Sequence, residues 1–170
     1  MEGLRQRLQE ALAPPSCIVG IGGDGLGDDA LGMCLAGDLA AEGLPDVVAA
    51  GTAPEDHAWS IAEAGYRSVL CIDAVDFGGA PGAVVLLDCA GIVSRFPQVS
   101  THRISLGALA RLIESHPPVR VRLLGVQPGS LRSGAGLSAP VRNTLEILKS
   151  LILEAARPCG ASGRERVCRP

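Results

Sequence analysis

The chain contains 170 residues, which is enough for one domain that buries most of its apolar surface. Its 47% hydrophobic residues are mainly aliphatic, and the 2% aromatic content argues against a module that stacks bases on rings. The net charge is -3, and Lys149 is the single lysine among scattered arginines, which excludes the clustered cations of a nucleic-acid surface.

The sequence also predicts a compartment. No apolar run approaches the length of a bilayer span, and residues 1–15 carry acids and lack the apolar core of a signal peptide, so we expect a cytoplasmic protein. No C-x-x-C pair occurs, which argues against a cysteine-based zinc site. We expect the first four cysteines to be small buried hydrophobes and the last two to be exposed. The six are Cys17, Cys34, Cys71, Cys89, Cys159 and Cys168.

Apolar periodicity and the positions of Pro and Gly predict alternating helices and strands. In chain order we expect a helix over 2–12, a strand over 17–22, a loop over 23–29, a helix over 30–41, a strand over 46–51, a helix over 55–64, a strand over 67–75, a turn over 76–82, a strand over 83–88, irregular structure over 89–103, a helix over 104–116, a strand over 119–126, a loop to 137, and a last helix that Ser138 caps and that runs to about 156.

This alternation is typical of an α/β fold. We expect three layers, α/β/α, around a mostly parallel five-stranded twisted sheet, with residues 83–88 as a candidate antiparallel edge. Residues 1–157 would form a single domain. Residues 158–170 have the composition of a disordered tail.

The first loop contains GIGGDG (20–25), which matches the G-x-G-x-x-G pattern of dinucleotide-binding enzymes. A pyrophosphate would sit at the start of the next helix, where Asp24, Asp28 and Asp29 would repel it. The second strand ends in Ala50-Gly51, without the acid that binds the ribose. A dinucleotide-binding α/β enzyme remains an alternative, whereas a phosphoacceptor receiver is excluded because no lysine ends the fifth strand.

Acidic residues follow the first and third strands, at the edge where open α/β sheets bind ligands. Asp28 and Asp29 follow the first strand, Asp73 and Asp76 close the third, and His102 precedes the helix from 104. Carboxylates with an imidazole are suitable ligands for a divalent ion such as zinc or nickel. The alternative stays open that Asp28 or Asp29 caps the helix from residue 30 and that the histidine is merely solvated.

Five blocks of sequence occur in the order found in one known family. They are GIGGDGLGDDALG (20–32), GTAPE (51–55), IDAVDFGGAPGAV (72–84), STHRISL (100–106) and LLGVQPGSL (123–131). Over about residues 17–154 the chain resembles the hydrogenase maturation proteases. Family members usually have Asn after the second glycine of the first loop, where this chain has Gly23-Asp24.

The resemblance implies a monomeric endopeptidase that cuts a C-terminal extension from the large-subunit precursor of a [NiFe] hydrogenase after nickel insertion. The nickel arrives with the precursor, and another divalent ion could substitute. The metal-binding positions of the family, two acids and a histidine, fall on Asp29, Asp73 and His102, which we therefore take as both metal ligands and catalytic residues.

Two mechanisms remain open at this point. The ion could polarise the scissile carbonyl or acidify a water, or Asp29 or Asp73 could act as general base while the metal serves docking. Ser100, near His102, lacks a nucleophile elbow, which argues against a serine mechanism. A non-catalytic nickel-handling factor is a further alternative, against which the three dispersed histidines argue.

Overall fold

The computed structural model describes residues 2–96 and 104–156. Its helices are α1 (Glu2–Ala11), α2 (Leu31–Ala41), α3 (Glu55–Glu63), α4 (Cys89–Arg95), α5 (Leu106–Glu114) and α6 (Ala139–Ala156), and a short 3-10 helix, η1, covers Gly27–Ala30. Its strands are β1 (Ser16–Ile21), β2 (Val47–Gly51), β3 (Ser68–Ala74), β4 (Val84–Asp88) and β5 (Arg120–Val126).

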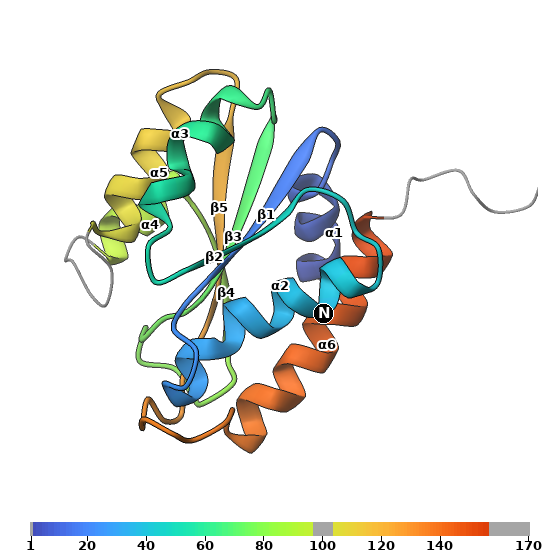
Figure 1. Ribbon diagram of the computed structural model, residues 1–170. Helices are drawn as coiled ribbons and strands as arrows, with labels where there is room; N and C mark the ends of the chain where they lie inside the picture. The colour runs from blue at the N-terminus through green and yellow to red at the C-terminus, as the bar shows by residue number, and fades with distance from the viewer. Residues whose placement is uncertain (1, 97–103, 157–170) are drawn as a thin grey trace, which may run out of the picture.

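The strands form one sheet in the order β2-β1-β3-β5-β4. The pairs β1–β2, β1–β3 and β3–β5 are parallel, and β4 lies antiparallel to β5 at the edge. In Figure 1, α1, α2 and α6 cover one face of the sheet and α3, α4 and α5 cover the other. The predicted three-layer fold with its antiparallel edge is confirmed.

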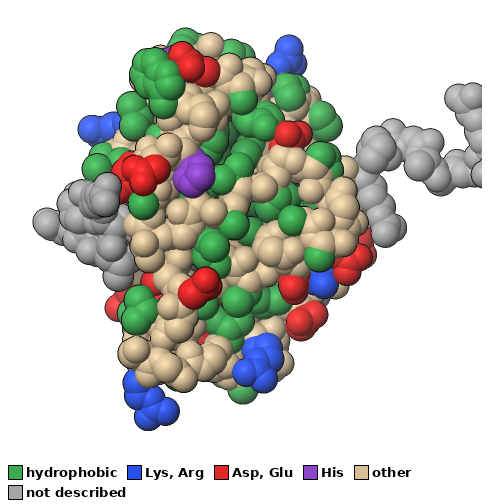
Figure 2. Space-filling model, in the orientation of Figure 1, with side chains coloured by type: hydrophobic (Ala, Val, Ile, Leu, Met, Phe, Trp, Pro, Cys, Tyr) green, Lys and Arg blue, Asp and Glu red, His purple; other side chains and the backbone are tan. Residues whose placement is uncertain are grey.

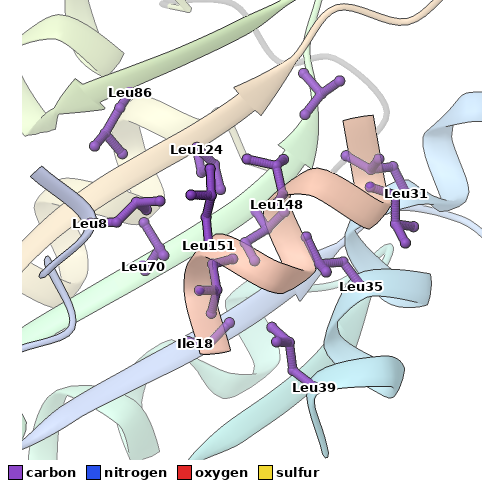
Figure 3. Close-up of a cluster of buried hydrophobic side chains, with 14 of the residues drawn as sticks. Leu8, Ile18, Leu31, Leu35, Leu39, Leu70, Leu86, Leu124, Leu148 and Leu151 are labelled. Carbon is purple, nitrogen blue, oxygen red and sulfur yellow. The ribbon is translucent and has the colours of Figure 1, made fainter. Parts of the chain in front are cut away.

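Side chains that alternate along each strand divide the core between the two faces. Ile18 of β1 packs with the leucines of α1, α2 and α6, as Figure 3 shows, whereas its neighbours Cys17 and Val19 pack under α3 and α5. Because both faces are covered, β1 and β3 are buried almost throughout and do not alternate between polar and apolar residues. Burial of these aliphatic side chains is the main stabilising contribution to the fold.

Two glycines let α2 approach the sheet closely. A Cβ atom at Gly20 would overlap the carbonyl oxygen of Gly32 and the Cβ of Ala36, and one at Gly32 would overlap the carbonyl oxygens of Ile21 and Ile72. The start of α2 therefore lies directly over the carboxyl ends of both β1 and β3. This contact fixes the height of the preceding η1 turn above the sheet.

Two sequence predictions of secondary structure differ from the structure: the predicted loop over 23–29 runs into the η1 helix, and part of the segment after β4 is helical. Residues 89–103 are expected to be irregular, but Cys89–Arg95 form α4. Asp88 is the N-cap of this helix: its Oδ1 accepts a hydrogen bond from the N–H of Gly91 at 2.8 Å. The helix buries Ile92. The predicted tail over 158–170 lies outside the described residues. Over the described ranges, no helix is both long enough and apolar enough to span a membrane.

The carboxylate of Asp28 ties the loop after β1 to the loop after β5. The residue is fully buried, and its carboxylate accepts hydrogen bonds from the N–H groups of Gly129 (2.7 Å), Ser130 (2.8 Å) and Ser138 (2.6 Å) and from the Ser138 hydroxyl (2.8 Å). The N–H of Asp28 in turn donates to the carbonyl oxygen of Ser130 at 2.9 Å. Hydrogen bonds to a charged acceptor are stronger than neutral ones, so two loops distant in sequence are held as one unit.

The capping roles predicted for these residues are not the ones observed. The N-cap of α2 is Ala30, where no side chain makes a capping hydrogen bond, and the hydroxyl of Ser138 donates to Asp28. Burial alone would raise the pKa of the Asp28 carboxyl. The hydrogen bonds from Ser138, Ser130 and Gly129 outweigh burial and lower this pKa below its usual value.

We predict that Asp28→Asn lowers the free energy of unfolding near neutral pH by roughly 2 kcal/mol, because the amide places a donor where donors already converge. The pKa is lower in the folded than in the unfolded chain, so the carboxylate stabilises the fold above its unfolded pKa and this contribution is lost as the pH falls through the folded pKa. Urea unfolding should therefore show a difference between parent and variant that narrows in acid.

The matched control is Asp24→Asn, an exposed acid in the same loop, which should change the unfolding free energy by less than about 0.5 kcal/mol. A parent-to-variant difference for Asp28→Asn that stays constant down to the acid range would contradict the prediction.

Candidate functional site

The loops that follow the parallel strands meet at one end of the sheet. The N–H of Gly22, after β1, donates to the carbonyl oxygen of Gly51 at the end of β2 (3.0 Å). The N–H of Val75, after β3, donates to the carbonyl oxygen of Val126 at the end of β5 (3.0 Å). In Figure 1 the loop after β5 and the start of α2 lie together at the lower end of the molecule. These hydrogen bonds, together with those of Asp28, link the loops at the carboxyl edge of the sheet.

Asp29 lies in the η1 turn and is only 5% exposed. Its Oδ2 accepts a hydrogen bond from the N–H of Gly23 at 2.6 Å, and its own N–H donates to the carbonyl oxygen of Leu26 at 3.2 Å. Gly22 has a φ of +128°, and a Cβ there would overlap the carbonyl oxygen of Asp29. The backbone of Gly22 therefore packs tightly against that of Asp29. The hydrogen bond from Gly23 orients the Asp29 carboxylate, which does not cap a helix.

Asp73 is the second-to-last residue of β3 and is 2% exposed. The parallel register pairs Gly20 of β1 with Ile72 of β3, which places Asp73 beside the end of β1. The helix start that follows Asp29 lies over the carbonyl oxygen of Ile72, directly before Asp73. Two buried acids thus belong to backbone segments that converge on one point at the carboxyl edge.

The third predicted ligand, His102, lies outside the described residues, as does Ser100. Within 2–96 and 104–156, no group of three His, Cys, Asp or Glu side chains is arranged to hold a metal ion. The structure therefore describes two members of the predicted set, Asp29 and Asp73, and brings their segments together.

The other two acids of the predicted cluster, Asp28 and Asp76, hold loops in place through hydrogen bonds. Asp28 joins the loops after β1 and β5, as described above. Asp76 is an exposed turn residue whose Oδ1 accepts hydrogen bonds from the side chain of Gln127 and from the N–H of Gly78, both at 3.0 Å; these bonds lower the pKa of the Asp76 carboxyl. The Oε1 of Gln127 also accepts from the N–H groups of Phe77 (2.9 Å) and Gly79 (3.0 Å), so Gln127 fixes this turn.

Sequence reasoning does not single out Glu55, although it lies in the GTAPE block. It is in the first turn of α3, and both of its carboxylate oxygens are shielded from water. A carboxylate at a helix N-terminus is favoured by the helix dipole. The sequence feature that could have drawn attention to Glu55 is its position directly after Pro54. In the structure, Pro54 is the N-cap of α3.

The cysteines of the described part do not supply a nucleophile. Cys17 and Cys71 are buried as predicted, and burial raises the pKa of each thiol to about 12. The burial predicted for the other two is wrong, because Cys34 is exposed and Cys89 is half-buried. Burial nevertheless raises the pKa of Cys34, and that of Cys89 to about 11. Since the thiolate is the reactive form, these four thiols are poor nucleophiles at neutral pH.

Positive charge does not gather on the face shown in Figure 2, where the Lys and Arg side chains lie scattered, mostly near its outline. At the start of α2, the place that a dinucleotide's pyrophosphate would need is taken by Asp28 and Asp29. A site built from buried carboxylates suits a cation or proton transfer instead.

Comparison with known proteins points to one family. The family model for hydrogenase maturation protease (HycI) matches residues 34–155. The hydrogenase 3 maturation protease of Escherichia coli strain K12 is 30% identical over 128 residues, which cover 74% of this chain and 81% of that protein.

Solved structures agree in the fold. The [NiFe] hydrogenase maturation protease HycI from Thermococcus kodakarensis KOD1 has a TM-score of 0.76 at 30% identity, over 88% of this chain and 98% of that one. The hydrogenase maturating endopeptidase HybD from Escherichia coli has a TM-score of 0.70 at 25% identity, over 85% of this chain and 93% of that one. With the family model matched across most of the fold and a relative at 30% identity, the chain belongs to the hydrogenase maturation protease family.

Proposed function

We propose that this protein is an endopeptidase that removes the C-terminal extension of a nickel-loaded [NiFe] hydrogenase large-subunit precursor. The observation that supports this most directly is the pair of buried acids, Asp29 and Asp73, at the carboxyl edge of a fold that belongs to this protease family. The proposal includes that the enzyme acts as a cytoplasmic monomer and that its nickel is part of the substrate.

Asp29, Asp73 and His102 are the residues that would recognise this nickel. Carboxylate oxygens suit a divalent ion, and the 2.6 Å hydrogen bond from Gly23 orients the Asp29 carboxylate in the way that outer contacts orient metal ligands. A precursor without nickel cannot complete such a set of contacts and would bind poorly. Recognition of the ion would therefore restrict cleavage to precursors that have already received nickel.

The proposal places the chemistry of cleavage at this same edge, and the raised pKa values of the buried Cys17 and Cys71 thiols argue against these cysteines as nucleophiles. A divalent ion there would supply polarisation of a carbonyl group or acidification of a water. The chain itself supplies a carboxylate that can orient a water and accept its proton, and a closely fitted backbone around it. Asp29 is suited to this task because the Gly23 N–H holds its Oδ2 in place.

Processing should depend on the nickel in the precursor. We predict that the purified protein shortens a nickel-loaded large subunit by its C-terminal peptide and leaves the nickel-free form intact, because the ion is part of what is recognised. Intact-mass spectrometry of both precursors after incubation measures this. Equal cleavage of the two forms, or rapid digestion of casein, would contradict the proposal. An unchanged precursor that transfers its nickel would favour the alternative of a nickel-handling factor.

We predict that Asp29→Asn and Asp73→Asn fold normally and lose processing, since the amide keeps the shape and removes the charge that a divalent ion requires. Thermal melting should place both variants within a few degrees of the parent, while the precursor assay shows no product. Asp56→Asn, an exposed acid on α3, is the control and should retain activity. Full activity of Asp29→Asn would show that its carboxylate is not needed.

The role of His102 is tested by comparing the three histidines. A histidine that contacts a metal must be neutral, so metal affinity should weaken as the pH falls. We predict that His102→Ala keeps its melting temperature without metal and loses both divalent-ion binding and processing, whereas His57→Ala and His116→Ala retain them. Calorimetric metal titration of all three variants is the measurement. Normal binding and cutting by His102→Ala, with loss in His57→Ala, would place the site in another loop.

A further inference from the structure

Two short loop segments near Asp29 are joined by hydrogen bonds, and we call them the rim: residues 25–28 and residues 130–134. The N–H of Gly134 donates to the carbonyl oxygen of Gly25 at 2.8 Å, and the N–H of Asp28 donates to that of Ser130 at 2.9 Å. Hydrogen bonds therefore join the segments at both ends, and the buried Asp28 carboxylate adds a further bond from the N–H of Ser130. Gly27 permits the close approach, because a Cβ there would lie 2.5 Å from the Ser130 carbonyl oxygen.

Each segment of the rim exposes a leucine. Leu131 is 53% exposed and Leu26 is 36% exposed. Among the described residues, the other large apolar side chains that are exposed belong to helices: Trp59 on α3, Leu112 on α5 and Ile147 on α6. The other residues of the two segments are Gly, Ser, Arg and Asp, so these leucines are the apolar side chains that the rim exposes. Exposed apolar side chains on two joined segments make the rim a candidate contact surface.

The rim is continuous with the candidate site. A point one Cβ bond from Gly23 lies 3.1 Å from both the Leu26 Cδ1 atom and the Asp29 Oδ2 atom, so the leucine methyl and the carboxylate flank the same glycine. The carbonyl oxygen of Leu26 also accepts the hydrogen bond from the Asp29 N–H. A polypeptide lying along the rim would pass directly beside the carboxylate assigned above to the reaction.

We propose that the rim is the docking surface for an aliphatic segment of the precursor next to its cleavage site, with Leu26 and Leu131 as the contact residues. This inference rests on the proposed function, because it takes the precursor as the occupant. The two exposed leucines are set among small residues, a surface whose chemistry would favour contact with aliphatic side chains. Because hydrogen bonds already join the two segments of the rim, docking would order little of the protein, which favours affinity.

The test measures binding and cleavage separately. Leu131→Asn and Leu26→Asn replace an apolar side chain by a polar one of similar size, and Leu131→Met keeps the apolar character. Ile147→Asn is the matched control, since Ile147 is 51% exposed on α6 and not on the rim. Calorimetry gives the Kd for the nickel-loaded precursor, mass spectrometry follows processing under single-turnover conditions, and thermal melting checks that each variant is folded.

The expected result is a Kd raised about tenfold by Leu131→Asn and several-fold by Leu26→Asn, with parent-like values for Leu131→Met and Ile147→Asn. The cleavage rate at saturating enzyme should stay close to that of the parent, as expected of residues that bind without reacting. Parent-like Kd values in both asparagine variants, or an equal rise in Ile147→Asn, would overturn the inference.

The same measurements keep this inference apart from the proposed function. If the parent binds the precursor without cutting it and the rim variants bind more weakly, the docking role of the rim is supported and the endopeptidase proposal is wrong. If all variants bind and cut like the parent, the endopeptidase stands and the rim fails. A parent protein that neither binds nor cuts the precursor would overturn both.

Discussion

The arrangement of the candidate site depends on one buried carboxylate, that of Asp28. Three main-chain N–H groups and one hydroxyl converge on it, all from a loop more than a hundred residues later in the chain. The neighbouring residue in the same η1 turn is Asp29. Because the two aspartates share a backbone turn, the clamp on the first sets the position of the second. The geometry near Asp29 is therefore a property of two distant loops and not of the first loop alone.

Two adjacent aspartates with the same intrinsic chemistry thus have different environments. The Asp28 carboxylate accepts four hydrogen bonds, which keep it ionised and leave it little capacity for a ligand. The Asp29 carboxylate is held at Oδ2 by the N–H of Gly23. The first acid joins two loops, and the carboxylate of its neighbour lies beside Gly22 and Gly23, just after the end of β1. This division of roles is how a loop rich in glycine can still present a functional group in a defined position.

Periodicity and breaker residues predict most of the fold, because the strands are apolar runs and the longer helices carry apolar stripes that bury against the sheet. The α4 helix escapes prediction because it is seven residues long and its cap, Asp88, also ends a strand. Ser138 and Asp28 show a different limit. Ser and Asp next to a predicted helix are usually expected to cap it. In the structure, however, the side chains of Ser138 and Asp28 bind each other across 110 positions of sequence. Pairings of that kind depend on the tertiary fold and leave no local pattern.

The sequence predicts that the acids after the first and third strands gather at one place, because parallel strands have their carboxyl ends at one edge of the sheet. Among these acids, the family resemblance selects Asp29 and Asp73. Burial of two acids at such an edge carries a desolvation cost that a divalent ion offsets. On the proposed function, that ion belongs to the precursor, so the favourable electrostatic contribution becomes available only when a loaded substrate arrives. An unloaded precursor, or an unrelated protein, would supply no positive charge to acids that are already buried in the free enzyme. Selectivity for the finished metal centre would then follow from the burial of the acids themselves, without a separate recognition domain.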